Sequence, residues 1–182
     1  MALTATIHHF EIAISDVDRS VYETLDLRVA QHPSETTRWL LLRTLAYALE
    51  WQDGIAFSKG GISSTDEPPI SVRDPTGLLL RWIDVGVPSA ERLHKAAKAA
   101  KVAVYTSELA QLRQKTSGAT IHKREEIEVW AVDAAFLDAL AGEVDRRASL
   151  SLTRTDGSLY VTVGGRALEA TLGRTTLAGE PG

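Results

Sequence analysis

Polar and apolar residues alternate near both ends of the chain, which is the pattern of β-strands with one buried face. Near the N-terminus the alternation predicts a strand over 4–14. Near the other end it brackets the turn Asp156-Gly157 and predicts an antiparallel hairpin over 149–163, followed by a strand over 168–172. Both end segments are therefore expected to add antiparallel strands to a sheet.

Apolar residues also recur at helical spacing after residues that cap helix N-termini. The segments are 35–51 after Ser34, 90–101 after Ser89, 134–144 after Asp133, and a short stretch through Tyr22 and Leu25 after Asp16 or Asp18. These segments are predicted to be helices.

Three other segments, 78–85, 102–105 and 127–132, are apolar at nearly every position, which is typical of strands buried on both faces. The order strand, helix, strand at this spacing predicts a right-handed crossover and parallel pairing. A short strand is predicted over 55–58, and residues 60–69 are rich in glycine, serine and proline and are expected to form a long loop. The fold class that follows is α/β with a mixed sheet (α+β).

Length and composition restrict the class of protein further. The chain has 182 residues and is expected to fold as one domain, with 177–182 as a disordered tail. It contains no cysteine, which excludes thiol nucleophiles, iron–sulfur clusters and cysteine-bound zinc. No apolar run approaches the roughly 20 residues of a membrane span. The N-terminus also has no charged leader, so a soluble, cytoplasmic protein is expected.

The charge pattern limits the partners that the chain can bind. Its net charge is −4, so no overall positive field attracts nucleic acid, and a polyanion would need a local basic patch. Such a patch is offered by basic residues that recur at every third position of the predicted helix, namely Arg92, Lys95, Lys98 and Lys101. This stripe is either a solvated helix face or a phosphate-binding surface.

Three acidic residues stand where predicted elements begin or end. Glu35 lies in the first turn of a helix, Asp66 in the long loop, and Asp84 at the carboxyl end of a central strand. Ligand sites in α/β sheets gather at such strand ends, and Mg²⁺ prefers carboxylate oxygens. The pattern therefore favours a magnesium site for phosphodiester hydrolysis.

Several blocks in order along the chain resemble the bacterial YaeQ family. They include Met1-Ala2-Leu3-Thr4-Ala5-Thr6-Ile7, Asp16-Val17-Asp18-Arg19, His32-Pro33-Ser34-Glu35-Thr36, Leu42-Arg43, Asp66-Glu67-Pro68 and Trp82-Ile83-Asp84-Val85-Gly86. The resemblance implies a compact variant of the PD-(D/E)XK restriction-endonuclease-like core, with antiparallel strands added by the N- and C-terminal segments.

The resemblance also implies roles for the acidic residues. Glu35 would be the acid of the helix, Asp66 the first aspartate of the motif and Asp84 the second acid. Asp74, which precedes Pro75, competes with Asp66 for the first position, and the sequence does not choose between them. The implied metal ligands are therefore Asp84 with either Asp66 or Asp74.

The motif lysine is missing from its usual place, since Gly86 stands two residues after Asp84. The resemblance implies that a residue of the following helix replaces it. Lys95 is the candidate lysine, and the resemblance supports Arg92 of the same helix better than Lys95. Either cation would stabilise the charge that develops on a phosphate during hydrolysis.

Each of these residues also has a structural interpretation. A glutamate at a helix N-terminus interacts with the helix dipole, and aspartates next to proline commonly close turns. Asp84 would be costly to bury without a partner, so Arg81, Arg92 or Arg43 competes with a metal for it. Arg43 lies in an apolar helical stripe and is expected to form an internal ion pair that positions Glu35 or Asp84.

Two functions from different classes follow. The first is a Mg²⁺-dependent phosphodiesterase acting on nucleic acid, in which Asp84 and Asp66 bind the metal and Glu35 acts on the water directly or through Arg43. The second is a catalytically degenerate module that binds protein or nucleic acid without hydrolysis. The acids around a strand end favour the first, whereas Gly86 and the absence of a global positive charge favour the second.

Overall fold

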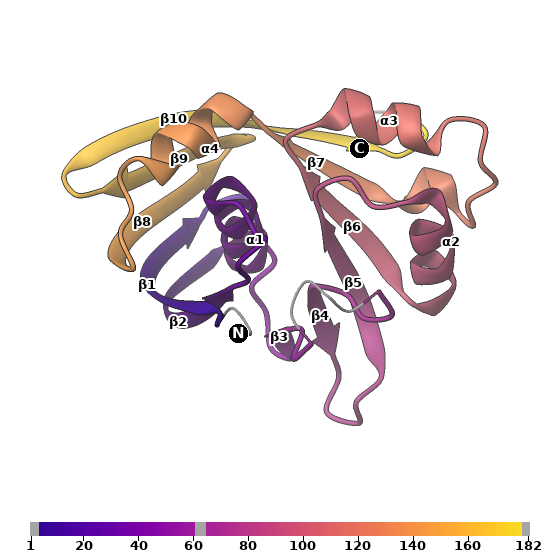
Figure 1. Ribbon diagram of the computed structural model, residues 1–182, viewed down its shortest axis with the longest axis horizontal. Coiled ribbons are helices and arrows are strands. Elements are labelled where there is room, and N and C mark those ends of the chain that lie inside the picture. Colours follow the sequence, from indigo (N-terminus) through magenta and orange to yellow (C-terminus); the bar gives the residue numbers. More distant parts are fainter. Residues whose placement is uncertain (1–3, 61–64, 180–182) are drawn as a thin grey trace. The chain divides into compact units, whose positions relative to one another are not determined.

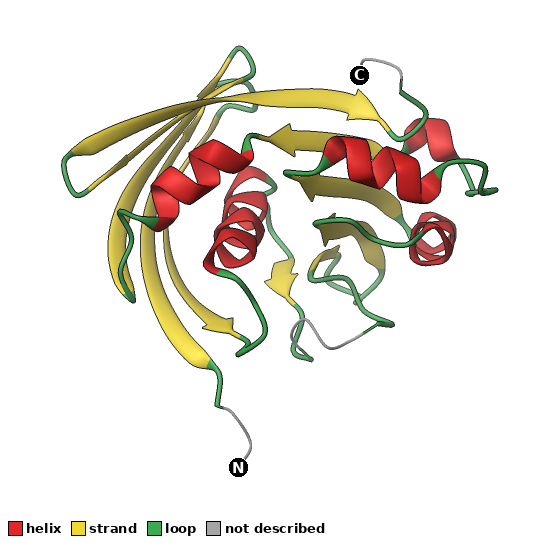
Figure 2. Ribbon diagram, turned by 45° about the horizontal axis from the view of Figure 1, so that its top comes forward, coloured by secondary structure: helices red, strands yellow, loops and turns green. Residues whose placement is uncertain are grey.

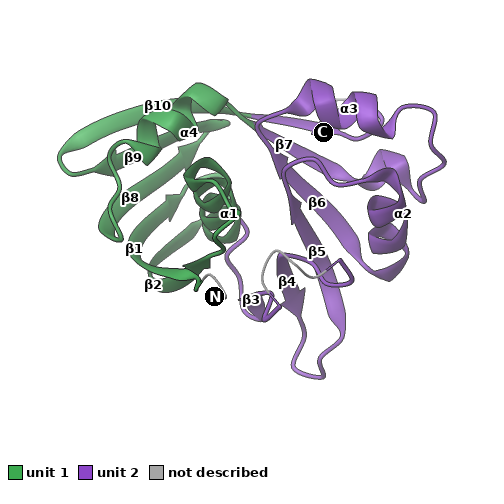
Figure 3. Cartoon of the chain, in the orientation of Figure 1, with its two compact units in different colours: residues 1–49, 132–172 green, residues 50–131, 173–182 purple. Residues whose placement is uncertain are grey.

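The computed structural model describes residues 4–60 and 65–179. Contacts divide the chain into two compact units, which are described separately (Figure 3). The first unit contains 1–49 and 132–172, and the second contains 50–131 and 173–182. One strand, β10 (Arg166–Thr176), contributes its first part to one unit and its last part to the other.

The first unit is a sheet with two helices on one face (Figure 1). Its strands occur in the order β2-β1-β8-β9-β10. All neighbours are antiparallel except β1 and β8, which are parallel. Besides the first part of β10, this unit contains β1 (Thr6–Asp16), β2 (Val21–Gln31), α1 (Thr37–Leu49), α4 (Ala134–Ala141), β8 (Arg147–Thr155) and β9 (Ser158–Val163).

The second unit continues from β10 through β7-β6-β5-β4-β3. Strands β5, β6 and β7 are parallel, and β3 and β4 are antiparallel to their neighbours. The elements are β3 (Ile55–Phe57), β4 (Ile70–Arg73), β5 (Leu79–Val85), α2 (Ala90–Ala99), β6 (Lys101–Thr106), α3 (Leu109–Thr116), a 3₁₀ turn (Arg124–Glu126) and β7 (Glu128–Val132).

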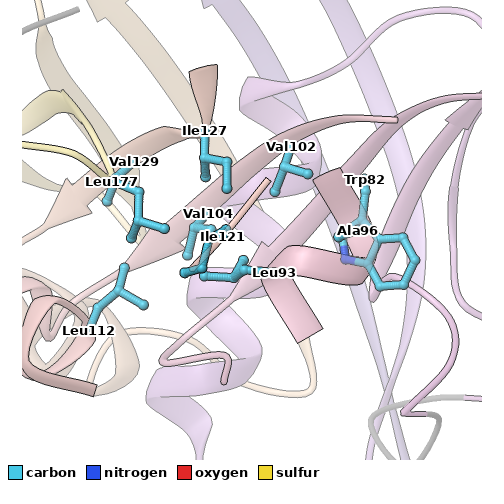
Figure 4. Packing of buried hydrophobic residues seen from close by; sticks show 10 residues of the cluster. All are labelled: Trp82, Leu93, Ala96, Val102, Val104, Leu112, Ile121, Ile127, Val129 and Leu177. Atoms are coloured by element: carbon cyan, nitrogen blue, oxygen red, sulfur yellow. The ribbon is translucent and has the colours of Figure 1, made fainter. Parts of the chain in front are cut away.

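Helices α2 and α3 bury one face of the parallel strands (Figures 2 and 4). Leu93 of α2 and Leu112 of α3 are fully buried against Val104 and Val129 of the sheet. Because successive side chains of a strand alternate between faces, Trp82 and Asp84 of β5 point to this same side. The core of the second unit thus fixes the position of Asp84.

The mixed α/β class predicted from the sequence is confirmed. The strands predicted over 4–14, 55–58, 78–85, 102–105 and 127–132, the terminal hairpin and the helices after Ser89 and Asp133 all occur. Ser89 accepts from the backbone N–H of Arg92, and Asp133 accepts from that of Ala135, so both are N-caps.

The helix predicted through Tyr22 and Leu25 is wrong. The segment forms β2, which pairs antiparallel with β1 along its whole length. Leu25, Leu27 and Val29 are buried at every second position, so the period is that of a strand. The polar residues around Asp16 and Asp18 form the hairpin turn between β1 and β2.

The predicted start of the next helix is also wrong. Helix α1 begins at Thr37, and the Thr36 hydroxyl accepts the backbone N–H of Trp39 at 3.2 Å. Thr36 is therefore the N-cap, while the Ser34 hydroxyl lies 2.7 Å from Nδ1 of His32 in the preceding turn. Strand β4 and helix α3 are further elements that the sequence patterns did not predict.

The predicted disordered tail begins too early. Leu177 is buried in the core of the second unit, and its backbone N–H donates to the carbonyl of Ile127 at 3.0 Å. Residues 180–182 lie outside the described part of the chain. Over the ranges 4–60 and 65–179, every helix is too short or too polar to cross a bilayer.

Candidate functional site

Asp84 lies near the carboxyl end of β5 and is 3% exposed. Its Oδ2 accepts from Nε of Arg92 at 2.6 Å and from the indole N–H of Trp82 at 3.0 Å. Its Oδ1 accepts from the backbone N–H of Val85 at 3.2 Å. Both carboxylate oxygens are thus hydrogen-bonded, and the charge is paired with an arginine.

Arg92 joins this strand end to the loop before β4. Its Nη1 donates to the carbonyl of Thr65 at 2.7 Å, and its Nη2 donates to that of Glu67 at 2.9 Å. The guanidinium also lies over the ring of Trp82, 5.2 Å from the ring centroid. All three nitrogens of the Arg92 guanidinium are therefore engaged within the fold.

Asp66 lies in the same loop and pairs with Lys95 of α2, at 2.6 Å between Oδ1 and Nζ. The side chains are 81% and 58% exposed, so water screens this pair. The hydrogen bond and the charge of Lys95 lower the pKa of Asp66. The structure thus gathers Asp84, Arg92, Asp66 and Lys95 in one neighbourhood, with each acid held by a cation.

Asp74 lies at the opposite end of β5 and closes the turn between β4 and β5. Its Oδ1 accepts from the backbone N–H of Thr76 at 2.8 Å, from the Thr76 hydroxyl at 2.6 Å and from the backbone N–H of Leu78 at 3.0 Å. The Thr76 hydroxyl, together with the backbone N–H groups, lowers the pKa of Asp74. The structural interpretation of Asp74 as a turn residue is confirmed.

Glu35 and Arg43 belong to the first unit and form the internal ion pair that the sequence predicted. Nη2 of Arg43 lies 3.0 Å from Oε1 and 3.2 Å from Oε2 of Glu35. The backbone N–H of His32 donates to Glu35 Oε2 at 3.1 Å, and Arg43 also donates to the carbonyl of Ala30 at 2.8 Å. Both side chains are almost fully buried, and Glu35 precedes α1 instead of lying within it.

The described side chains do not fit a magnesium ion at the predicted site. Mg²⁺ needs several oxygen ligands in octahedral array. The oxygens of Asp84 face N–H donors, and Asp66 faces an ammonium group. Across the two described ranges, no three His, Asp or Glu side chains are grouped so that they could hold a metal.

Cations at the start of α2 and around its end have different environments. Arg92 and Lys95 are bound to acceptors of the loop, whereas Lys98 and Lys101 have no ion-pair partner within residues 4–60 and 65–179. The helix predicted over 90–101 ends at Ala99, so Lys98 lies in its last turn and Lys101 is the first residue of β6. Lys98 and Lys101 are exposed and line a cavity of about 620 Å³. The basic stripe therefore divides into a bound half and an open half.

A charge network that the sequence patterns did not predict adjoins this cavity. Arg81 donates from Nε and Nη2 to the two oxygens of Glu50, at 2.9 and 3.0 Å, and from Nη2 to Glu128 at 2.9 Å. Tyr105 donates to Glu50 at 3.0 Å, and Arg174 donates to Glu128 at 3.3 Å. The one signal in the sequence was an arginine inside the apolar segment 78–85.

The network shifts the pKa values of its members. Burial acts to raise the pKa of Glu128, but the hydrogen bonds and charges of Arg81 and Arg174 outweigh it and lower that pKa. Burial likewise acts to lower the pKa of Arg81, and Glu50 and Glu128 outweigh it and raise that pKa. Both groups therefore stay charged at neutral pH.

These features define a mixed α/β protein. The acids of its predicted site, Asp84 and Asp66, are paired with Arg92 and Lys95, and its second unit has a cavity lined by basic side chains. The chain belongs to the YaeQ family, whose model, described as "YaeQ protein", matches residues 1–172. It is 32% identical over 176 residues to "Uncharacterized protein YaeQ" of Escherichia coli (strain K12), covering 94% of this chain and 96% of that protein. The corresponding Salmonella typhi protein is 33% identical with the same coverage.

Solved structures agree with the fold. The crystal structure of YaeQ protein from Xanthomonas axonopodis pv. citri matches with a TM-score of 0.85 and 30% identity, covering 98% of this chain and all of that chain. The YaeQ structure from Pseudomonas syringae matches with a TM-score of 0.84 and 29% identity, covering 98% of each chain.

Proposed function

We propose that this YaeQ-family chain is a nucleic-acid-binding module of the PD-(D/E)XK type that does not hydrolyse its ligand, and that it acts in the cytoplasm. The order α1, β3, β4, β5, α2, β6 along the chain supports the superfamily assignment, because the resemblance implies a helix followed by a small mixed sheet.

The pairing of Asp84 is the observation that carries the proposal. A catalytic carboxylate must be available to a metal or a water, whereas Asp84 is buried and accepts from Arg92, Trp82 and the backbone of Val85. Its partner Arg92 is held in turn by two loop carbonyls, so it too is unavailable to a phosphate. The acids and cations of the predicted site act as structural groups that anchor the loop.

Nucleic acid is favoured over protein by the open half of the basic stripe. Lys98 and Lys101 are exposed and form no ion pair with any residue that the structure describes, and phosphate contacts by such side chains supply most sequence-independent affinity for nucleic acids. Since the chain as a whole carries a charge of −4, these contacts must be local. Binding is therefore expected to be weak and strongly dependent on salt.

Fluorescence anisotropy with short labelled strands tests the proposal. Single-stranded DNA, single-stranded RNA and duplex DNA are titrated with the protein at several salt concentrations, with and without millimolar Mg²⁺, and each strand is then run on a denaturing gel. The expected result is binding that weakens as salt rises, needs no Mg²⁺ and leaves every strand intact. The variant Lys98→Gln/Lys101→Gln is expected to lower the affinity and the salt dependence, because two phosphate contacts are lost.

The matched control is Lys59→Gln, which removes an exposed lysine that does not line the cavity. Absence of binding to every strand at low salt would contradict the proposal. Mg²⁺-dependent cleavage that Asp84→Asn abolishes would replace it with the phosphodiesterase hypothesis, in which Asp66 and Asp84 bind the metal.

A further inference from the structure

The cavity of the second unit lies where α2 ends and β6 begins, and Lys98 and Lys101 line it. Its wall combines the end of α2, the start of β6, residues 122–128, Arg81 of β5, and Arg174 and Thr176 of β10. Its volume of about 620 Å³ lies within the range of small-molecule sites, which is about 300–1,000 Å³. A ligand of nucleotide size would therefore fit within one unit of the protein.

Cations outnumber acids in the cavity wall. The cations are Arg81, Lys98, Lys101, Lys123 and Arg174, and the acids are Glu125, Glu126 and Glu128. Ion pairs join Glu128 to both arginines and Glu126 to Lys123. Lys98 and Lys101 form no ion pair in the described chain, and Glu125 is the one wall acid there without one, so an anionic ligand would meet two ammonium groups and a single opposing carboxylate.

Arg174 adds a third donor at the same wall. Its hydrogen bond to Glu128 is long, at 3.3 Å, and its side chain is 47% exposed. A guanidinium has five N–H groups, so most of those of Arg174 stay available to a phosphate. The guanidinium also lies over Trp130, 5.3 Å from the ring centroid, which couples the cavity wall to a fluorescent side chain.

The rest of the wall is mixed, because His122 and Thr176 line it together with aliphatic residues. Ala97, Ala99 and Ala100 contribute small aliphatic side chains next to the cations, whereas Val102 and Ile127 are buried in the core beneath the cavity. A ligand that matches this wall has an anionic group at one end and a body with both apolar and polar edges at the other. Inorganic phosphate lacks such a body, and the chain of a fatty acid has no polar edge to meet His122 and Thr176.

We infer that this cavity binds a nucleotide, with its phosphate between Lys98, Lys101 and Arg174 and its base against Ala97, Ala99 and Ala100. The inference deepens the proposed function, because the same nucleotide is either a free mononucleotide or one residue of a bound strand. It assigns the binding of nucleic acid to the open end of α2 and leaves Asp84, Asp66 and Arg92 in their structural roles.

Isothermal titration calorimetry with adenosine 5′-monophosphate, together with tryptophan fluorescence, tests the inference on the full chain. The wild type is expected to show saturable binding and a change in fluorescence, since Arg174 covers Trp130. Lys98→Gln/Lys101→Gln is expected to weaken binding by about tenfold or more, because two charged hydrogen bonds to phosphate are lost. Lys59→Gln is expected to bind as the wild type does.

A second variant fills part of the cavity and leaves its charge unchanged. Ala100→Leu places a longer apolar side chain in the cavity wall and is expected to weaken mononucleotide binding without changing the net charge. Circular dichroism confirms that each variant is folded. The inference is overturned if the wild type shows no saturable binding of the mononucleotide, or if both cavity variants bind it as tightly as Lys59→Gln does.

Oligonucleotide titrations of the same variants separate this inference from the proposed function. Strand binding without mononucleotide binding would contradict the nucleotide site and leave the proposed function standing. Mononucleotide binding without strand binding would support the cavity and contradict the proposed function. Loss of both ligands in Lys98→Gln/Lys101→Gln, and of the mononucleotide in Ala100→Leu, would support both.

Discussion

Cations lie near both ends of helix α2, and their roles differ. At the first end, Arg92 and Lys95 hold Asp84, Asp66 and two loop carbonyls. At the second end, Lys98 of the last turn and Lys101, which begins β6, have no such acceptors in the described ranges and line a cavity. The difference shows that the availability of a cation, more than its place in a periodic stripe, decides whether it can bind a ligand.

The largest effect on stability is expected from replacing Asp84. Replacement by asparagine leaves the guanidinium of Arg92 partly buried without its counter-ion, so Asp84→Asn is expected to lower the free energy of unfolding by about 2–3 kcal/mol. Urea unfolding followed by tryptophan fluorescence measures the change. Asp133→Asn is the matched control, because aspartate and asparagine are nearly equal N-caps. A more stable Asp84→Asn protein would indicate an unpaired carboxylate, as in an empty metal site.

Arg92→Lys tests whether the guanidinium of Arg92 anchors the loop before β4. Lysine keeps the charge, but its compact ammonium group cannot reach Asp84, Thr65 and Glu67 in the geometry of a guanidinium, nor stack on Trp82 in the same way. A loss of about 1–2 kcal/mol in the free energy of unfolding is expected. Proteolysis in the loop before β4 should become faster in this variant, and an unchanged cleavage rate would contradict the anchoring role.

The pH dependence of stability tests the network beside the second end. The pKa of Glu128 is lowered from its ordinary value of 4.5, so its stabilising contribution is present above pH 4.5 and is lost as the pH falls through the lower folded value. Glu128→Gln is expected to cost about 1 kcal/mol at neutral pH, since the group is half-buried. Its stability should also fall less steeply than that of the wild type below pH 4.5. If the free energy of unfolding of the two proteins changed equally with pH, the ion pairs of Glu128 would not contribute to stability.

Lys95→Gln is expected to have the smallest effect. The pair with Asp66 is exposed, so the urea midpoint of this variant should match that of the wild type. Strand binding should also be unchanged, because Lys95 lies in the bound half of the stripe. A loss of affinity as large as that of Lys98→Gln/Lys101→Gln would remove the distinction between the two ends of α2.

The sequence predicted elements well where the apolar period was unambiguous. The near-continuous apolar segments became β5, β6 and β7, and their parallel pairing followed from the helix between the first two. Strand β2 was missed because polar capping residues precede it, although its buried positions alternate. Helix α1 was started two residues early because Ser34 and Thr36 are both good caps, and only the Thr36 hydroxyl meets the helix N-terminus.

The candidate site was harder to predict because ion pairs depend on tertiary contacts. The sequence offered three arginines as partners for Asp84. Asp84 pairs with Arg92 because its side chain lies on the side of β5 that α2 covers. An internal ion pair of Arg43 was predictable from the cost of burying an arginine in an apolar stripe, but the sequence left Glu35 and Asp84 as alternative partners, and the structure pairs it with Glu35. The network of Glu50, Arg81 and Glu128 joins residues far apart in the chain, so no local pattern could predict it.

Titration of the full chain with MgCl₂ by calorimetry tests most directly whether Asp84 is a structural group or a metal ligand. We expect no saturable heat at millimolar Mg²⁺, and the same trace for the wild type and Asp84→Asn, because Arg92 and Trp82 already bind the carboxylate. A saturable site in the wild type that is absent from Asp84→Asn would contradict this expectation.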